Sequence, residues 1–355
     1  MSAAAIAVDL FSDTVTRPTP AMRRFMCDAE VGDEQQFEDP TVNRLQDMVA
    51  DLLGKEAALF LPSGTMANQV AIRTLTHPGD DVIVPWEAHV VLHETGAAAA
   101  NSGVQFTPVG SGGTFGVAEF EAACKPRGHM IHPPTTLVVV ENTHNRGGGL
   151  VFPQTDAVAI CRSAAAREVA SYCDGARLLN AAIAADVPAT ELAAPFDMVS
   201  LSLSKGLGAP VGSMLAGRRD AMRAAVRHRR MFGGAMRQAG ILAAAGSYAL
   251  AHNVERLAVD HANARSMAGR LAESAGIGLD ARRVETNIIV FDVADAPAFV
   301  AACREHGVLL NAFGPRSVRA VTHLGVDAAA CDAATATMVA VGDHSPLDRA
   351  SATPS

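Results

Sequence analysis

The chain has 355 residues, of which 49% are apolar, and its formal net charge at pH 7 is −8. This length allows two or three domains with substantial cores. The acidic balance argues against nucleic acid as the main partner, because phosphate binding needs a basic surface. We find no signal peptide, no apolar run long enough to cross a membrane and no Cys-x-x-Cys pair among the six cysteines. We therefore expect a cytoplasmic protein with free thiols, no membrane partner and no metal site.

Short apolar runs alternate with longer amphipathic stretches along the first 216 residues. The runs are 57–61, 81–85, 136–141, 169–174, 198–203 and 212–216. Continuous apolar strands separated by helices are typical of a mostly parallel sheet covered on both faces. Such a sheet binds ligands beyond the carboxyl ends of its strands, so the polar residues that end these runs are the candidates for function.

The first two candidates follow the first two runs. Ser63, Gly64 and Thr65 come after run 57–61 and begin a helical pattern. Small residues at a helix start leave backbone N–H groups for an anion such as a phosphate, although serine and threonine also cap helices that bind nothing. His89 follows run 81–85, where an imidazole can stack on an aromatic ligand; alone it would be interpreted as an ordinary loop histidine.

Two further candidates lie about one strand-helix-strand unit apart. Asp174 ends run 169–174, and Lys205 follows run 198–203 in a turn rich in serine and glycine. A partly desolvated lysine acts as a nucleophile, and a carboxylate holds a protonated pyridine nitrogen. Taken singly, each has a common alternative, a surface lysine and a helix N-cap. Together they indicate pyridoxal 5′-phosphate (PLP), with Lys205 as its Schiff-base lysine, Asp174 at its ring nitrogen and residues 63–65 at its phosphate.

The second half of the chain changes character. Residues 218–274 are rich in helix-forming residues, and strand-like runs return at 286–291 and 308–310. We expect a large PLP-binding α/β domain over 1–249, which includes the N-terminal segment, a small C-terminal domain over 250–344, and a disordered tail over 345–355. The basic run 227–230 is typical of a solvated helix face.

Ordered motifs along nearly the whole chain resemble one family. They are DLFSDTVTRP (9–18), VGD (31–33), EDPTVN (38–43), ENTHN (141–145), SLSKGLGAPVGS (202–213), MRQAG (236–240) and VTHL (321–324). The chain resembles the threonine aldolase / β-eliminating lyase family of fold-type I PLP enzymes. The resemblance implies an aspartate aminotransferase-like large domain with a mostly parallel central sheet, and a smaller α/β domain.

The resemblance also implies roles for individual residues around the cofactor. Lys205, Asp174 and His89 match the Schiff-base lysine, the pyridinium partner and the ring-stacking histidine. Gly64 and Thr65 match the phosphate cradle. Arg237 matches an arginine that reaches the cofactor phosphate from a neighbouring subunit.

Other residues match groups around the substrate. Ser12, Arg177 and Arg319 match the α-carboxylate site, with Arg177 also beside the cofactor, and arginine suits this task because it contacts a carboxylate with two prongs. The alternative for Arg319 is an alternating edge strand with one exposed side chain. His132 matches a second histidine near the substrate hydroxyl. The catalytic base stays open between His132, His89 and a water molecule.

The implied activity is retro-aldol cleavage of a β-hydroxy-α-amino acid, such as L-threonine or L-allo-threonine, to glycine and an aldehyde. The family assembles as dimers or homotetramers with shared active sites. Two alternatives stay open: another reaction of the same substrate and cofactor, such as β-elimination, and a non-catalytic PLP-fold binding protein, which the intact Lys205 and Asp174 argue against. The substrate side chain stays open too, because Gln36-Phe37 stands where the family usually carries Tyr-Gly.

Overall fold

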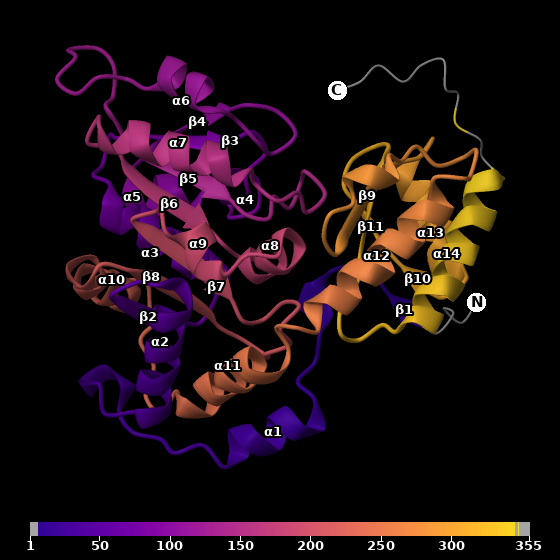
Figure 1. The fold of residues 1–355 in the computed structure, drawn as a ribbon, viewed down its shortest axis with the longest axis horizontal. Helices are drawn as coiled ribbons and strands as arrows, with labels where there is room; N and C mark the ends of the chain where they lie inside the picture. The colour runs from indigo at the N-terminus through magenta and orange to yellow at the C-terminus, as the bar shows by residue number, and fades with distance from the viewer. Residues whose placement is uncertain (1–5, 345–346, 348–355) are drawn as a thin grey trace. The chain divides into compact units, whose positions relative to one another are not determined.

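The computed structural model describes residues 6–344 and residue 347. The chain divides into two compact units: a larger one of Arg17–Gly147 and Val151–Val254, and a smaller one of the described residues up to Thr16, Gly148–Leu150 and the chain from Glu255. Residues 6–16 therefore do not belong to the large domain in which we expected them. The reason is that β1 (Val8–Asp9) pairs in parallel with β10 (Val308–Leu309), which brings an indigo strand into the orange-to-yellow unit of Figure 1. Apart from Leu347, the expected tail lies outside the described residues.

The larger unit is built on a seven-stranded sheet with the order β2-β8-β7-β6-β5-β3-β4. Strand β8 is antiparallel to both of its neighbours, and the other strands run parallel to one another. The mostly parallel sheet expected from the apolar runs is confirmed. The strands are β2 (Ala57–Leu61), β3 (Asp81–Pro85), β4 (Gln105–Val109), β5 (Thr135–Glu141), β6 (Ala170–Asp174), β7 (Met198–Ser202) and β8 (Ser213–Gly217).

Helices bury both faces of this sheet, which is why β3, β5, β7 and β8 are buried along their whole length. Val70 and Ile72 of α3 (Gly64–Leu75) share one core cluster with Val139 of β5 and Tyr172 of β6. Side chains alternate along a strand, so Ser171 faces the opposite side of the sheet from Tyr172. There its side chain lies within hydrogen-bonding reach of Cys161 of α7 (Gln154–Ala165). Full burial of each large apolar side chain contributes roughly 1.5–3 kcal/mol.

The remaining helices of the larger unit surround this sheet. They are α1 (Pro20–Cys27), α2 (Pro40–Leu53), α4 (His89–Leu92), α5 (Ala97–Ser102), α6 (Val117–Ala123), α8 (Leu178–Ala185), α9 (Ala189–Ala193), α10 (Arg219–Met231), α11 (Gly240–His252) and the 3₁₀ turn η2 (Glu34–Gln36). The basic run 227–230 lies on α10. We expected a solvated helix face there, and this expectation is wrong for Arg229. Arg229 is 2% exposed, donates to the carbonyl of Phe60 over 2.9 Å and pairs with Glu34.

The smaller unit has its own core. A three-stranded antiparallel sheet has the order β11-β12-β9, with β11 (Asn311–Ala312), β12 (Ser317–Val321) and β9 (Ile288–Asp292). Its apolar side chains form one buried cluster with those of α12 (Leu257–Leu271), α13 (Ala296–Glu305) and α14 (Ala328–Asp343). The short turns η1 (Asp13–Val15) and η3 (Ala281–Arg283) complete the unit.

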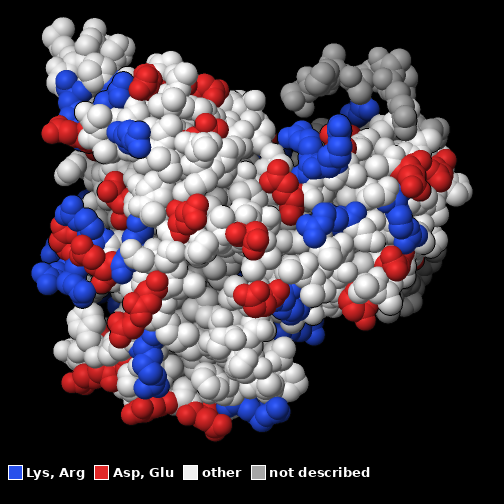
Figure 2. Space-filling view, viewed as in Figure 1, with Lys and Arg blue, Asp and Glu red and all other residues white. Residues whose placement is uncertain are grey.

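Charged side chains of both signs are interspersed over the face of the larger unit drawn in Figure 2. Mixed charges of this kind produce no broad field of one sign on that face. Within residues 6–344, no helix is both long and apolar enough to cross a membrane. The part of the chain that the structure describes also contains no cluster of three or more His, Cys, Asp or Glu side chains arranged for a metal ion.

Candidate active site

The sequence candidates of the larger unit follow strands that end at one edge of the sheet. Leu61 of β2 and Ser202 of β7 both pair with Ser213 of β8, so these two strand ends lie level. Glu141 of β5 likewise pairs with Asp174 of β6. The segments that leave this edge carry Ser63, His89 and Lys205. Carboxyl ends of parallel strands are the usual ligand site of such a sheet.

Asp174 is a buried acceptor at the end of β6. It is 3% exposed, its Oδ2 accepts a hydrogen bond from Asn68 Nδ2 over 2.8 Å, and its Oδ1 accepts one from the backbone N–H of Ala176 over 3.2 Å. The alternative interpretation, a helix cap, is wrong, because the N-cap of α8 is Arg177. A carboxylate with acceptor capacity left over at this edge fits a protonated pyridine nitrogen.

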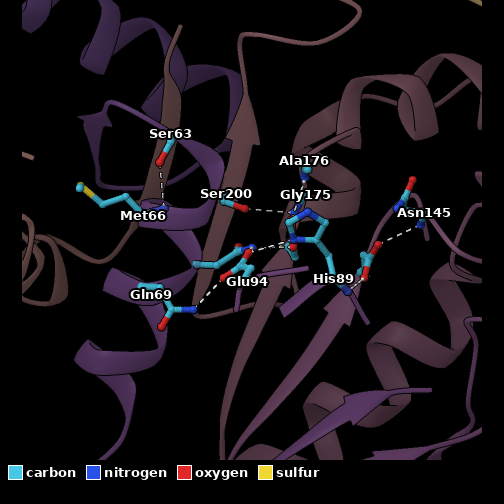
Figure 3. A network of polar contacts seen from close by, with 12 residues as sticks. Ser63, Met66, Gln69, His89, Glu94, Asn145, Gly175, Ala176 and Ser200 are labelled. Carbon is cyan, nitrogen blue, oxygen red and sulfur yellow. Dashed lines mark hydrogen bonds and ion pairs between the residues drawn. The ribbon is translucent and has the colours of Figure 1, made fainter. Parts of the chain in front are cut away.

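The turn after Asp174 requires a glycine. A Cβ on Gly175 would lie 2.2 Å from the carbonyl oxygen of Ser200, closer than any real contact. With glycine at this position, β6 comes close enough to β7 for the backbone N–H of Gly175 to donate to Ser200 Oγ over 3.2 Å, as Figure 3 shows. This close approach of β6 and β7 fixes where the Asp174 carboxylate lies.

His89 begins α4 and is held at two points (Figure 3). Its backbone N–H donates to Glu141 Oε2 over 2.7 Å, and its ring Nδ1 lies 2.9 Å from Glu94 Oε1. Burial lowers the pKa of His89, and so does the charge of Lys205. The hydrogen bond to Glu94 and the charge of Asp174 raise this pKa by more, so it lies above its ordinary value. Asp174 and Lys205 therefore both lie within electrostatic range of this imidazole.

The N-terminus of α3 has the form of an anion site. Ser63 caps the helix by accepting from the backbone N–H of Met66 over 3.2 Å. Its hydroxyl is therefore a helix cap, which is the alternative interpretation of this serine. Within the described residues, the backbone N–H groups of Gly64 and Thr65 donate to no protein acceptor, and a Cβ on Gly64 would meet nothing within 4 Å. Free N–H groups at a helix start suit a phosphate.

Lys205 is half-buried in the loop that joins β7 to β8. Its carbonyl accepts from the backbone N–H of Gly208 over 2.9 Å, in a turn where Gly208 has φ +79°. A positive φ of this size favours glycine. The acceptor at Asp174, the imidazole of His89, the cradle at residues 64–65 and this amine together fit PLP.

The carboxylate-binding candidates are divided between the two units. Arg177, 5% exposed, lies in the larger unit. In the smaller unit, Arg319 donates to the carbonyl of Phe11 over 3.0 Å, next to Ser12, and its guanidinium lies 4.4 Å from the ring centre of Phe313. The edge-strand alternative for Arg319 is wrong: β12 lies between β11 and β9, and Arg319 is 7% exposed.

Two expected residues are not brought into this cluster. His132 is exposed in the loop before β5, and its ring stacks on that of His129 with 4.4 Å between centroids. This loop enters the amino end of β5, at the sheet edge opposite Glu141 and Asp174. Arg237 is also exposed, and its guanidinium pairs with Asp33 over 3.1 Å.

Comparison with known proteins shows the family of this chain. The family model described as beta-eliminating lyase matches residues 9–296. The low specificity L-threonine aldolase of Escherichia coli O157:H7 is 45% identical over 325 residues, which are 90% of this chain and 94% of that one. The low-specificity L-threonine aldolase 1 of Arabidopsis thaliana is 40% identical, over 89% and 91% of the two chains. The chain belongs to the beta-eliminating lyase family.

Solved structures show that the fold of this chain is shared. The Leishmania major threonine aldolase superposes with a TM-score of 0.78 at 21% identity, over 93% of this chain and 98% of that one. A putative aromatic amino acid beta-eliminating lyase/threonine aldolase from Exiguobacterium sp. gives 0.78 at 20% identity. The expected fold class is thereby confirmed.

The sequence analysis did not identify the residues that lie behind the site. Asn68, Gln69, Glu94 and Tyr172 are buried and bonded to one another, to His89 or to Asp174. Their partners are 5 to 106 positions away along the chain, so no local pattern marks them. The one available signal was polarity inside apolar stretches, which is too common to single out a residue.

Proposed function

We propose that this chain is a PLP-dependent aldolase that cleaves a β-hydroxy-α-amino acid, such as L-threonine or L-allo-threonine, to glycine and an aldehyde. The observation that carries the proposal is the cluster of Asp174, His89 and Lys205 at the carboxyl edge of the sheet. The 45% identity to a low specificity L-threonine aldolase over nine-tenths of the chain supports the choice of substrate class.

Each residue of the cluster has a different role at the cofactor. PLP, when bound, supplies a protonated ring that accepts the electrons of the Cα–Cβ bond as it breaks. Lys205 provides the amine that attaches the cofactor, and the carboxylate of Asp174 keeps the proton on the ring nitrogen. The N–H groups of Gly64 and Thr65, with Ser63 capping the helix, hold the phosphate.

Other residues handle the amino acid. Arg177 of the larger unit binds its α-carboxylate through paired guanidinium contacts, and the same role for Ser12 and Arg319 of the smaller unit stays a prediction from the sequence. His89 is the base for the β-hydroxyl proton: its Nδ1 is engaged by Glu94, which leaves Nε2 to accept a proton. This assignment chooses among the three bases left open by the sequence, and it supersedes His132, which lies at the other edge of the sheet.

The test is an absorbance spectrum combined with product analysis. Purified protein should show a visible cofactor band that borohydride removes, and it should release aldehyde from L-threonine, L-allo-threonine or phenylserine. Lys205→Ala should abolish the band and the activity, whereas Lys55→Met, at a lysine bonded to the carbonyl of Phe196, should retain the band. Full activity of Lys205→Ala, or absence of a band after added PLP, would refute the proposal.

A second candidate reaction is β-elimination, favoured by the description of the family model that matches residues 9–296. Elimination releases ammonia and a keto acid, whereas aldol cleavage releases glycine and an aldehyde. The same assay mixtures therefore separate the two. Ammonia without aldehyde would keep the cofactor site and replace the reaction.

We also propose that the chain works as a homo-oligomer. Large apolar side chains are exposed on helices of the larger unit that pack together: Phe25 of α1, Met48 of α2 and Ile241 of α11 are 49%, 39% and 46% exposed. A second copy would cover such side chains. Arg237 is exposed, as a residue that serves a neighbouring subunit must be. The cytoplasmic location stays a prediction.

A further inference from the structure

Glu94 is a buried carboxylate that lies behind His89. It lies in the turn between α4 and α5, and its side chain is fully buried. A buried carboxylate is costly unless several donors surround it. Three do: Asn68 Nδ2 at 2.7 Å, Gln69 Nε2 at 2.7 Å and His89 Nδ1 at 2.9 Å.

These hydrogen bonds connect His89 to Asp174. Oε1 of Glu94 receives His89 and Asn68, and the same amide nitrogen of Asn68 also donates to Asp174 Oδ2 over 2.8 Å. The amide oxygen of Asn68 accepts from the Tyr172 hydroxyl. Burial, followed by the charge of Asp174, raises the pKa of Tyr172 well above its ordinary value, so this hydroxyl remains a donor.

The orientation of the Asn68 amide is thereby determined. Its nitrogen lies between two carboxylates and its oxygen faces a hydroxyl donor. A flipped amide would place an acceptor against two acceptors. Glu94 is thus joined to His89 directly and to Asp174 through one rigid amide.

We propose that Glu94 is a positioning residue that couples the two protein groups on the cofactor ring. It keeps the His89 proton on Nδ1, which leaves Nε2 to accept a proton, and through Asn68 it fixes the Asp174 carboxylate. This inference rests on the proposed function and deepens it. The arrangement is that of a carboxylate behind a catalytic histidine, where the carboxylate orients the ring and favours its charged form.

Glu94→Gln is the informative variant, because the chain can keep its hydrogen bonds while losing the charge. Gln69 Oε1 is buried with no partner among the described atoms, so a rotated Gln69 amide can accept from the new amide nitrogen. The matched control is Asp81→Asn, at the opposite edge of the sheet. Asp81 is also fully buried and accepts from Thr107 Oγ1 at 2.6 Å and Thr135 Oγ1 at 2.8 Å.

The first readout is the titration of His89 in cofactor-free protein, followed by nuclear magnetic resonance and assigned with His89→Asn. Asp174, Lys205, Glu141 and His93, whose ring centre lies 5.4 Å from that of His89, also face this histidine and stay unchanged in both variants. Glu94→Gln should lower the pKa of His89, because the carboxylate raises it, whereas Asp81→Asn should leave it unchanged. An unchanged titration in Glu94→Gln, or an equal change in the control, would overturn the proposal.

The second readout uses the loaded enzyme. Loss of a carboxylate that orients a metal-bound histidine costs about 10–100-fold in metal affinity or activity, and we take this range as the order of magnitude for Glu94. We expect kcat of Glu94→Gln to fall by about this factor, with a shifted pH–rate profile and little change in KM, while Asp81→Asn keeps the wild-type profile. A fall in thermal stability with an unchanged profile would reduce Glu94 to a structural role.

A measurement on the wild type covers the case in which Glu94→Gln does not fold. Nitrogen shifts of His89 above its pKa should place the remaining proton on Nδ1. A proton on Nε2 would overturn the proposal. Because this experiment and the titration need no cofactor, a supported network without PLP binding would reject the proposed function alone.

Discussion

At the scale of single residues, the hydrogen-bond partners of a buried carboxylate decide what it can do. Asp174 accepts from Asn68 and from the backbone N–H of Ala176, and the N-cap of α8 is Arg177 instead. Glu94 accepts from two amides of α3 and lies against a histidine five positions earlier in the chain.

Gly175→Ala tests the close approach that positions Asp174. The added Cβ would lie 2.2 Å from a backbone oxygen, which cannot rotate away. We expect a loss of about 1–3 kcal/mol in the free energy of unfolding, typical of overpacking, and weaker PLP binding. Urea titration measures the first and absorbance the second. Gly269→Ala, where a Cβ meets nothing within 4 Å, should instead stabilise the chain; equal effects would contradict this account.

Phe37 occupies a left-handed backbone conformation, with φ +60°. The threonine aldolase / β-eliminating lyase family usually carries glycine at this position. A non-glycine residue there costs roughly 1–2 kcal/mol. Phe37→Gly should therefore be more stable than Phe37→Ala by about 1 kcal/mol. Both variants lose the same ring, 58% exposed, so their difference isolates the backbone. Identical urea midpoints would show that the turn is not strained.

At the scale of elements, the direction of the strands decides which residues meet. The carboxyl ends of β2, β3, β5, β6 and β7 share one edge, so segments far apart in sequence supply one site. The amino end of β5 lies at the other edge, which removes His132 from the cluster. Arg319 shows the same dependence: its strand β12 is central rather than at an edge, and that order was not readable from the apolar run.

His89→Asn and His132→Asn should therefore differ in their effect on the cofactor. We expect His89→Asn to change the visible band and to lower kcat about 10²-fold or more, as expected for loss of an acid–base group. His132→Asn should leave the band and the PLP dissociation constant unchanged. A changed band in His132→Asn would show that this loop reaches a cofactor, and would contradict its placement at the far edge.

At the scale of the whole molecule, each unit has its own core, and the core of the smaller unit contains a buried histidine. His261 of α12 is 1% exposed, and burial, followed by the charge of Arg265, lowers its pKa to about 4. Because the folded pKa lies below the unfolded value near 6.5, protonation favours the unfolded state. This stability is present above about pH 6.5 and is lost as the pH falls toward 4.

His261→Gln should remove that part of the acid sensitivity. One pH unit between the two pKa values corresponds to about 1.4 kcal/mol, so the effect is at most about 3 kcal/mol. Urea titrations at pH 7 and pH 4.5 measure it. His77→Gln is the control, because the His77 side chain is 92% exposed. If both variants followed the wild-type pH dependence, His261 would not be the titrating group.

Ile241→Arg tests the proposed oligomer. Ile241 is 46% exposed on α11, which packs against α1 and α2, and a charge there should oppose burial by a second copy. We expect sedimentation velocity to show a smaller species than the wild type. Val259→Arg, at an apolar side chain 52% exposed on α12, should leave the assembly unchanged. A monomeric wild type would reject the oligomer itself.

The sequence alone determined the mostly parallel sheet and the strand ends, because these follow from local hydrophobic patterns. It also singled out Asp174 and Lys205 as candidates, because they lie in motifs that are continuous along the chain. The tertiary structure decided the rest. It assigned residues 6–16 to the smaller unit through β1 and β10, separated His132 from the cluster, buried Arg229 and joined Glu94 to His89 and Asp174. These outcomes depend on strand order and on contacts between distant segments, which form only when the chain folds and most of its buried polar groups find hydrogen-bond partners.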